Sequence, residues 1–266
     1  TPVATFARAK EILKANAKEE GDNILSIMYG VTVAEGTSET WSLAGIPNAM
    51  IVRDINVSSG HGVYVYGELT LEDIVIDGNC LYSALSKNGN AFARVDKGGK
   101  LTVKKGTKLQ NFRTSSSAFV YAFAAANITN TITVEDVTVT GIQSYTMTNS
   151  ETAGAFVFGL YGGGNNILTV KNGTFTGNDA RLLYVTGAGA HVVNVDDCNF
   201  SNNTCKGCGG IFLLSNTSAT SAVVNVNGGT YTNNRCTNTA MSYANGTIGY
   251  VKSPATLNIN GGTFTG

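Results

Sequence analysis

Two histidines and an unevenly spread set of carboxylates are the residues of this sequence that could carry acid–base chemistry. His61 stands in a Gly-His-Gly sequence, and His191 stands alone. No carboxylate follows Asp197, so residues 198–266 contain neither Asp nor Glu. An imidazole can act as a general base and a carboxylate as an acid, a base or a metal ligand. Any such chemistry must therefore lie upstream of residue 198.

Cysteines are the second group of reactive side chains. They are Cys80, Cys198, Cys205, Cys208 and Cys236. Cys205 and Cys236 each follow the aromatic residue of a repeated segment by five positions, so we expect them to be neighbours at a distance that suits a disulfide or, alternatively, a stacked pair of thiols. A four-cysteine zinc site is not expected, because about five extended residues of about 3.3 Å each separate Cys198 from the turn after its strand. We predict no metal and no cofactor.

The composition is that of a folded chain without a strongly charged surface. Of 266 residues, 32 are glycine and 3 are proline, 42% are hydrophobic, and 18 basic side chains balance 18 acidic ones. This balance argues against nucleic-acid binding, which needs a surplus of lysine and arginine. No apolar run reaches the roughly 18–20 residues that cross a bilayer, so membrane insertion is not expected. No secretory signal is visible, and the sequence begins at Thr1 without methionine.

The elements that would position these residues are the short strands of a repeating unit. LTVKNGTFTGN from Leu168 is typical, with apolar residues alternating with Thr or polar residues on both sides of a small residue. Copies begin at Leu69, Leu101, Ile132, Leu168, Val193, Val224 and Leu257, and an earlier one begins at Met50. A second apolar patch, such as AFVYAF at 118–123, follows at a similar offset. The pattern predicts an all-β fold, a right-handed parallel β-helix of about eight coils over residues 31–266.

Residues 1–30 are expected to form a cap and the first strand. A helix over 2–20 is indicated by Thr1 or Thr5 as N-cap and by Gly21 as the C-terminal stop. Its apolar stripe is Phe6, Ala9 and Leu13. Such a helix would cover the first coil of the solenoid, whose core is otherwise exposed.

Stacking of coils about 4.8 Å apart brings equivalent residues together. The position after the first inward residue alternates in sign along a charge ladder of Arg53, Glu72, Lys104, Glu135, Lys171 and Asp196. Opposite charges on neighbouring strands contribute about 0.2–1 kcal/mol each. The turn after the second strand carries an asparagine ladder of Asn79, Asn111, Asn178, Asn203 and Asn234. The same register stacks the rings of Phe175, Phe200, Tyr231 and Phe264 inside the solenoid.

This architecture resembles the right-handed parallel β-helix of the pectin-lyase-like superfamily. Its coils are similar to those of polymorphic outer membrane proteins, in which Phe-x-x-Asn and Gly-Gly-Ala-Ile motifs recur. FTGN at 175–178 and FSNN at 200–203 match the first motif, and GGIF at 209–212 approximates the second. The resemblance implies either a secreted or surface-exposed adhesive passenger or a polysaccharide-processing enzyme.

The enzymatic alternative is a polysaccharide lyase or glycoside hydrolase. A Gly-His-Gly signature of the superfamily's hydrolases matches residues 60–62, but the paired Asp of that signature set is represented by Asp196-Asp197, more than four coils away. Inverting hydrolysis needs carboxyl groups about 6.5–9.5 Å apart. The family's lyases need an acidic calcium site, whereas each acid of the charge ladder is bracketed by bases. We therefore predict no catalytic residue.

Two surface patterns complete the sequence. Candidate glycosylation sequons lie at Asn56, Asn127, Asn172, Asn199, Asn202, Asn216 and Asn245. Outward Thr-x-Thr pairs occur at Thr138/Thr140, Thr174/Thr176, Thr230/Thr232 and Thr263/Thr265, the arrangement of ice-binding solenoids and a minor alternative for this chain.

The sequence favours a non-catalytic, extracellular structural or adhesive solenoid, a rod segment of a surface stalk or filament. Its ligand would be a glycan or another component of a host surface. Because the chain stops at Gly266 inside a repeat, we expect that it either continues into a longer chain or packs end to end with another copy.

Overall fold

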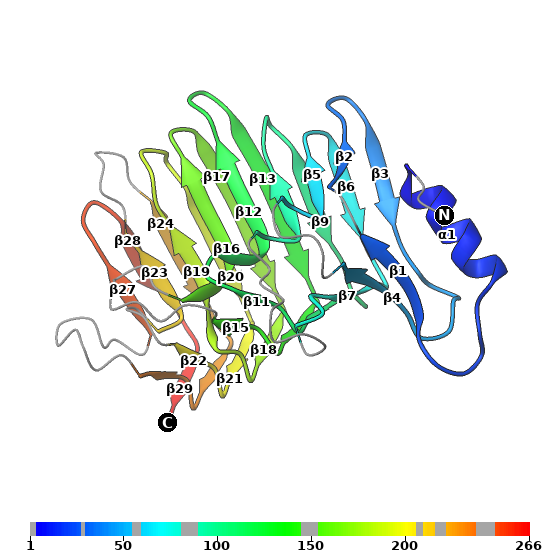
Figure 1. Cartoon of the computed structure of the whole chain (residues 1–266). Coiled ribbons are helices and arrows are strands. Elements are labelled where there is room, and N and C mark those ends of the chain that lie inside the picture. Colours follow the sequence, from blue (N-terminus) through cyan, green and yellow to red (C-terminus); the bar gives the residue numbers. More distant parts are fainter. Residues whose placement is uncertain are drawn as a thin grey trace.

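The computed structural model describes residues 4–27, 30–54, 60–80, 90–144, 154–205, 210–215, 222–237 and 248–266. These residues form a right-handed parallel β-helix with a helix at its N-terminal end, as the sequence predicts (Figure 1). Three parallel sheets run along the solenoid, and each coil contributes one strand to sheet A, one to sheet B and one to sheet C. Eight coils are complete, and β29 adds a ninth strand to sheet A.

Sheet A holds the second strand of the repeating unit. Its order is β1 (Asn23–Ile27), β4 (Ala49–Arg53), β7 (Val75–Asp77), β10 (Lys108–Gln110), β14 (Thr138–Thr140), β18 (Thr174–Thr176), β21 (Asn199–Ser201), β25 (Thr230–Thr232) and β29 (Thr263–Thr265). Two short pairs extend the corner that follows it, β11 (Arg113–Thr114) with β15 (Gln143–Ser144), and β22 (Thr204–Cys205) with β26 (Arg235–Cys236).

Sheet B holds the second apolar patch of each repeat. Its order is β2 (Val31–Val33), β5 (Val63–Val65), β8 (Ala93–Val95), β12 (Ser117–Ala124), β16 (Ala155–Gly162), β19 (Ala180–Val185), β23 (Phe212–Leu214) and β27 (Gly249–Val251).

Sheet C holds the first strand of the repeating unit. Its order is β3 (Ser38–Trp41), β6 (Glu68–Leu71), β9 (Lys100–Val103), β13 (Thr129–Glu135), β17 (Asn165–Lys171), β20 (Val192–Asp196), β24 (Val223–Asn227) and β28 (Thr256–Ile259).

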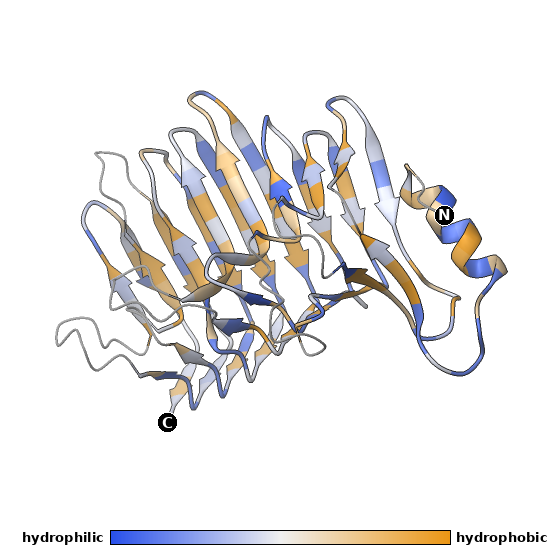
Figure 2. Ribbon diagram, in the orientation of Figure 1, coloured by the Kyte–Doolittle hydropathy of each residue, from blue (hydrophilic) through white to orange (hydrophobic). Residues whose placement is uncertain are grey.

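The alternation of residues along each strand explains the coil. Val, Ile, Leu and Phe at every second position point inward and are buried, and Thr, Asn, Tyr or charged residues between them point outward. Figure 2 shows this alternation of hydrophobic and hydrophilic residues along the strands. Where sheet C turns into sheet A, the chain takes a left-handed backbone conformation at a short polar residue. Asp73, Asp136, Asn172 and Asp197 have φ between 48° and 54° there, which Asp and Asn tolerate better than bulkier residues.

Inside sheet A, an aromatic stack joins the last coils. The rings of Phe175 and Phe200 lie 4.7 Å apart, those of Phe200 and Tyr231 5.1 Å, and those of Tyr231 and Phe264 4.5 Å, each nearly parallel. The predicted stack is confirmed. It follows from the strict register of β18, β21, β25 and β29.

The N-terminal helix is α1 (Phe6–Ala15), shorter than the predicted 2–20. Thr5 is the N-cap, and its side chain accepts a hydrogen bond from the Arg8 backbone N–H. Phe6 is the buried residue of α1, and its ring stacks on Trp41 of β3 with centroids 4.8 Å apart. The helix ends at Asn16, where the backbone leaves helical geometry, so the stop lies five residues before Gly21.

The repeat that begins at Met50 belongs to a different sheet from the one predicted. Met50 and Ile51 lie in β4 of sheet A, where they pair with Val75 and Ile76 of β7. The strand that precedes β6 in sheet C is instead β3, with Trp41 opposite Leu71. The two strands of the unit have similar apolar spacing, and that similarity is why the first copy was assigned to the wrong one.

Candidate binding face

The outer face of sheet B carries a concentration of tyrosines. Six of the seven tyrosines that the structure describes lie on it, and Tyr231 is the exception. We call this face the tyrosine strip. It comprises Tyr64, Tyr66, Arg94, Tyr121, Phe123, Tyr161, Tyr184 and Tyr250, all half-buried. Tyrosine combines a large rigid ring with a polar hydroxyl, and for that reason it is enriched in binding surfaces.

Rings of neighbouring coils contact one another along the strip. Tyr121 and Tyr161 are stacked with centroids 4.3 Å apart, and Tyr161 meets Tyr184 edge to face at 5.7 Å. Gly159 makes this possible, since a Cβ at that position would lie 2.6 Å from the Tyr161 ring. The same arrangement recurs at Gly30, where a Cβ would lie 2.5 Å from the ring of Tyr64. Both glycines leave room for a ring to lie against the sheet.

Two cations lie over these rings. The guanidinium carbon of Arg94 is 5.7 Å from the ring centres of both Tyr121 and Phe123, and Arg94 Nη2 donates to Asp96 Oδ2 at 2.7 Å. The Lys97 ammonium lies 4.4 Å from the Tyr66 ring centre. These contacts combine cation–π attraction with an ion pair and hold the cations against the sheet.

His61 lies at the edge of the strip. Its ring contacts Tyr64 edge to face and tilts against Tyr121, and its Nδ1 donates to the Ala91 carbonyl at 3.2 Å. Burial, with smaller contributions from the positive charges of Arg94 and Arg53, lowers the pKa of His61 to about 4. The imidazole is therefore neutral at pH 7 and is one more flat, uncharged ring of the strip.

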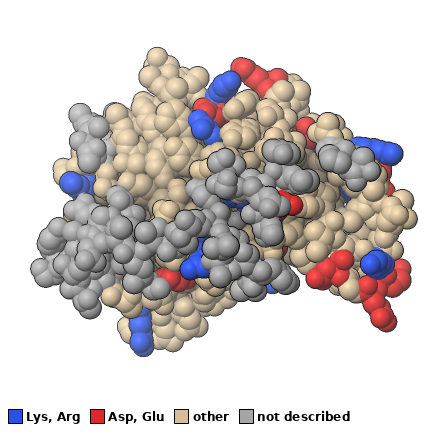
Figure 3. All heavy atoms as spheres, in the orientation of Figure 1, with Lys and Arg blue, Asp and Glu red and all other residues tan. Residues whose placement is uncertain are grey.

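The outer face of sheet C is uncharged or mixed in sign and has no aromatic residue at its central outward row in the described coils. That row reads Thr40, Thr70, Thr102, Thr133, Thr169, Asn194, Asn225 and Asn258. The Asn225 amide donates to Asn194 at 3.0 Å, and the Asn258 amide donates to Asn225 at 2.9 Å. Figure 3 shows charged side chains in small mixed groups on a largely uncharged surface.

The charge ladder lies beside this row. Glu72, Lys104, Glu135, Lys171 and Asp196 occupy one position of sheet C on successive coils, as their spacing predicts. Lys104 Nζ lies 3.4 Å from Glu72 Oε2, which is the one salt bridge between ladder members within the described residues.

Arg53 is not part of the ladder, and the prediction that places it there is wrong. It belongs to β4 of sheet A, is buried, and donates to the carbonyls of Asn90 and Gly60 at 2.7 and 3.2 Å. The cause is the misassigned repeat that begins at Met50.

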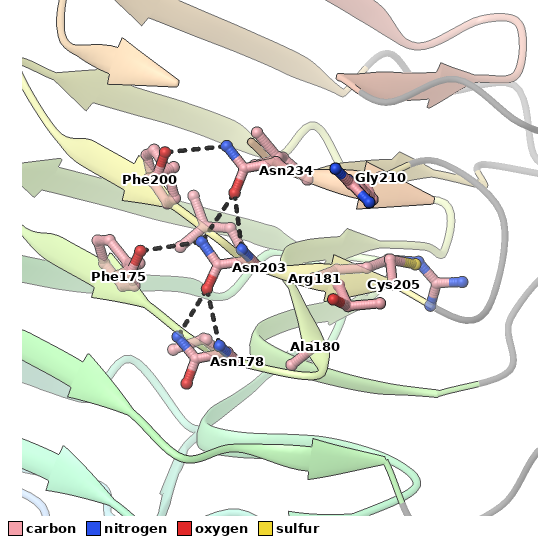
Figure 4. A pocket seen from close by; sticks show the side chains of 14 residues that line it. Phe175, Asn178, Ala180, Arg181, Phe200, Asn203, Cys205, Gly210 and Asn234 are labelled. Carbon is pink, nitrogen blue, oxygen red and sulfur yellow. Dashed lines mark hydrogen bonds between the residues drawn. The ribbon is translucent and has the colours of Figure 1, made fainter. Parts of the chain in front are cut away.

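The asparagine ladder is built from three of the five predicted members (Figure 4). The Asn178 amide donates to Asn203 Oδ1 at 2.9 Å, and the Asn203 amide donates to Asn234 Oδ1 at 3.0 Å. All three side chains are buried, and Asn203 and Asn234 also donate to the carbonyls of Phe175 and Phe200 at 2.9 Å. The ladder thus satisfies backbone groups at the corner between sheets A and B.

Asn79 and Asn111 do not join this ladder. The segment from Leu101 has one extra residue before its second strand, so Asn111 lies one position before the ladder position. It is level with Asn202, and both have left-handed backbone conformation. Both asparagines instead donate hydrogen bonds to the buried carboxylate of Asp77. The Asn111 side-chain amide and the Asn79 backbone N–H each donate to Asp77 at 2.7 Å.

A pocket with room for about one water molecule lies beside the ladder. Arg181, Cys205 and Gly210 line it opposite Asn203 (Figure 4). A second, smaller and mostly apolar pocket lies between Arg53, Asp77 and Phe92. Each is too small for a substrate, and three or more His, Cys, Asp or Glu side chains do not gather at any point of the described chain in a way that could hold a metal ion.

A second internal ladder was missed. The Asn130 amide donates to Asn166 Oδ1 at 2.9 Å, and His191 Nδ1 accepts from the Asn166 backbone N–H at 3.2 Å, at the corner between sheets B and C. All three side chains are completely buried, and burial lowers the pKa of His191. Each lies two residues before the first apolar residue of its repeat, so a repeat extended upstream would have shown them. His191 is structural.

The cysteines lie as the aromatic spacing indicates. Cys205 and Cys236 are direct register partners on β22 and β26, and both are thiols in the structure, so the disulfide stays a prediction. Cys80 and Cys198 are buried thiols, and burial raises the pKa of Cys198 to about 12. Cys208 lies outside the described residues.

The surface patterns fall on the outside of sheet A and its corners, except for Asn127, which lies at the corner between sheets B and C. Asn127, Asn172, Asn199 and Asn202 are exposed, whereas Asn56, Asn216 and Asn245 lie outside the described residues. The Thr pairs of β14, β18, β25 and β29 occupy two outward rows, interrupted by Asn199 and Ser201 of β21 and by Lys108 and Gln110 of β10.

The chain was compared with protein-family models, with curated proteins and with solved structures. None of them matches. The likeness to the pectin-lyase-like superfamily therefore rests on the parallel β-solenoid architecture. No helix among the described residues is long and apolar enough to span a bilayer.

Proposed function

We propose that this chain is a non-catalytic adhesive solenoid of the cell surface or extracellular space, which binds its partner through the tyrosine strip. The observation that carries the proposal is the placement of six of the seven described tyrosines on one outer face of three. A folding requirement would distribute them over all three sheets, because each sheet has the same alternation. Their concentration indicates selection for contact with another molecule.

The rod is suited to display rather than to turnover. Side chains of the strip are held by rings, ion pairs and backbone carbonyls, so the face is preorganised before a partner arrives. The exposed sequons and the Thr- and Asn-rich outer rows fit a secreted or surface location. The solenoid would act as a segment of a stalk or filament, either within a longer chain or by end-to-end contact of copies.

Adhesion is tested with the fluorescently labelled full chain on intact epithelial, yeast and bacterial cells. We expect saturable binding to at least one cell type and a loss of at least tenfold with Tyr64→Ala/Tyr121→Ala. The matched control is Thr70→Ala/Thr133→Ala on the same coils of sheet C, which should bind like the wild type. Absence of binding to every cell type, or equal binding by both double variants, would contradict the proposal.

A second candidate, a polysaccharide lyase, is favoured by one observation. His61 is a neutral imidazole beside phenols and the guanidinium of Arg94, a set that could serve acid–base chemistry on a uronate. Against it, His61 is only 6% exposed and its Nδ1 is bonded to a carbonyl. Release of unsaturated product from a polyuronide panel, lost in His61→Gln, would establish this activity in place of the adhesive one.

A further inference from the structure

The tyrosines of the strip recur with a regular period along the solenoid. Strand register places Tyr64, Arg94, Tyr121, Gly159, Tyr184, Leu213 and Tyr250 in one outward row, on seven successive coils. Tyrosine therefore occupies every second coil. With coils about 4.8 Å apart, the tyrosines of this row repeat every ~9.6 Å. The Tyr161 ring of the neighbouring row lies between those of Tyr121 and Tyr184, so the rings form one continuous surface there.

This period matches that of a polyproline II helix. Polyproline II has three residues per turn and a rise of about 3.1 Å, so one turn advances ~9.3 Å. A segment in this conformation, lying along the solenoid axis, would present one residue to a tyrosine on each turn. The row from Tyr64 to Tyr184 would then accommodate about two turns. We propose that the tyrosine strip binds a proline-rich segment of a partner protein in the polyproline II conformation.

The hydrogen-bonding groups of the strip complement such a ligand. Tyr64 Oη already accepts the His61 backbone N–H at 3.4 Å, so its own proton remains for an outside acceptor. The Asp96 carboxylate is engaged by Arg94 Nη2 at 2.7 Å and by the Lys97 backbone N–H at 2.8 Å. These contacts leave the Tyr64 hydroxyl as a donor and occupy both Asp96 oxygens as acceptors. Proline-rich segments offer solvated carbonyls and few N–H groups, which fits this surface better than a sugar chain that brings many donors.

The charge and the width of the tyrosine strip indicate what kind of partner segment it would bind. Arg94 and Asp96 neutralise each other, and Lys97 over the Tyr66 ring leaves one end of the strip positive. We therefore expect a partner segment with an acidic residue beside its prolines. Outward residues two positions apart, such as Tyr121 and Phe123 of β12, place the strip in two rows about 7 Å apart. That width suits one extended chain, whereas a globular partner needs about 800 Å² of surface.

The inference rests on the adhesive function proposed above, and the experiment separates the two. The probe is a fluorescein-labelled twelve-residue peptide of proline with two glutamates, and its control replaces each proline by glycine or serine and keeps the glutamates. Fluorescence anisotropy with the full chain should show saturable binding of the proline peptide and at least tenfold weaker binding of the control peptide. Tyr121→Ala and Tyr184→Ala should each weaken binding at least tenfold, and Thr133→Ala and Thr169→Ala should leave it unchanged.

Two further variants guard against loss of structure. Tyr121→Phe and Tyr184→Phe keep the rings and remove the hydroxyls, so they should bind with intermediate affinity, and a cooperative thermal unfolding transition of each variant shows that it is folded. Equal binding of both peptides, no binding at millimolar concentration, or indifference to the tyrosine variants would overturn the inference. Binding of polygalacturonate or xylan in place of the peptide would assign the strip to a glycan. That result, like strip-dependent adhesion to cells without peptide binding, leaves the adhesive function standing, and loss of cell adhesion as well would remove both.

Discussion

Sheets B and C are formed by the same eight coils, yet their outer faces differ completely. Beneath both, the inward residues are aliphatic or aromatic and fully buried, as with Phe158 of β16 and Leu168 of β17. Outside, sheet B presents rings that contact one another from coil to coil, and sheet C presents rows of threonine, asparagine and alternating charge. The inner faces build the solenoid, and the outer faces are left to carry different tasks.

The physical reason lies in the pleat of the strand. Successive side chains point to opposite faces, so an outward residue can change without altering the interior. Rows on sheet C need only agree with the coil above and below, which asparagine amides and opposite charges do. Stacking of coils does not require aromatic rings on the outside of sheet B. We attribute their presence there to binding.

The largest expected effect tests whether the two interiors are equivalent. Phe158→Ala beneath sheet B should destabilise the chain by about 3–5 kcal/mol, and Leu168→Ala beneath sheet C by about 2–5 kcal/mol, because each leaves a cavity in a packed core. Urea unfolding followed by circular dichroism measures both. A loss below about 1 kcal/mol at either position would show that one sheet contributes little to the core.

The buried asparagine ladder at Asn203 should contribute more to stability than the outer asparagine row of sheet C at Asn225. Asn203→Ala leaves the Asn178 backbone N–H and the Phe175 carbonyl buried without their partners, which should cost about 2–4 kcal/mol. Asn225→Ala removes similar bonds on the outer face of sheet C, where water replaces them, and should cost less than about 1 kcal/mol. The ratio of the two losses in chemical unfolding is the readout, and equal losses would refute the distinction.

The edge of the strip should contribute a pH dependence of stability through His61. The pKa of His61 falls from 6.5 in the unfolded chain to about 4 in the folded one. Below pH 6.5 the unfolded state binds a proton that the folded state does not, so stability is lost as pH falls from about 6.5 towards 4. By this linkage, His61 should lower the free energy of unfolding by about 2 kcal/mol between pH 7 and pH 5.

His61→Gln isolates this contribution. Its unfolding free energy should change between pH 7 and pH 5 by about 2 kcal/mol less than that of the wild type. His191→Gln is the matched control, because the pKa of His191 is also lowered by burial. That variant should keep the pH dependence of unfolding that is due to His61. An unchanged pH profile in His61→Gln would show that the imidazole is not held neutral.

Ring stacking itself should be measurable. A double-mutant cycle with Tyr121→Ala and Tyr161→Ala should give a coupling energy of about 0.5–1.5 kcal/mol. The register neighbours Thr133 and Thr169 of sheet C should give a coupling near the lower end of cross-strand pairs, about 0.2 kcal/mol. Coupling of the same size on both faces would remove the energetic difference between them.

The smallest effect is expected from the charge ladder. Glu72→Gln breaks the pair with Lys104 on the outside of sheet C, at a cost of about 0.2–1 kcal/mol in dilute buffer. In 1 M NaCl the difference from the wild type should vanish, because salt screens exposed charges. A loss that persists at high salt would mean that Glu72 acts through a contact other than its charge.

Much of the fold could be predicted because each copy of the repeat has the same type of residue at equivalent positions. Leu168, Val193 and Val224 share one position, and the structure places them side by side in sheet C. Arg53 and Asn111 were misplaced for the opposite reason. Each lies where the spacing between strands changes, and there the alternation fits two registers equally well. The ladder of Asn130, Asn166 and His191 was missed because it lies just outside the repeated unit.

The sequence by itself determined the repeating coil and the alternation of inward and outward residues along its strands, since alternation and turn residues are local properties of the chain. Only the tertiary structure decided which outward residues meet. Tyr64, Tyr121 and Tyr184 are separated by dozens of residues and lie within apolar segments that differ in length. Their common row exists because inter-strand hydrogen bonds fix the register of successive coils, and a shift of that register by one residue would move a ring to the opposite face.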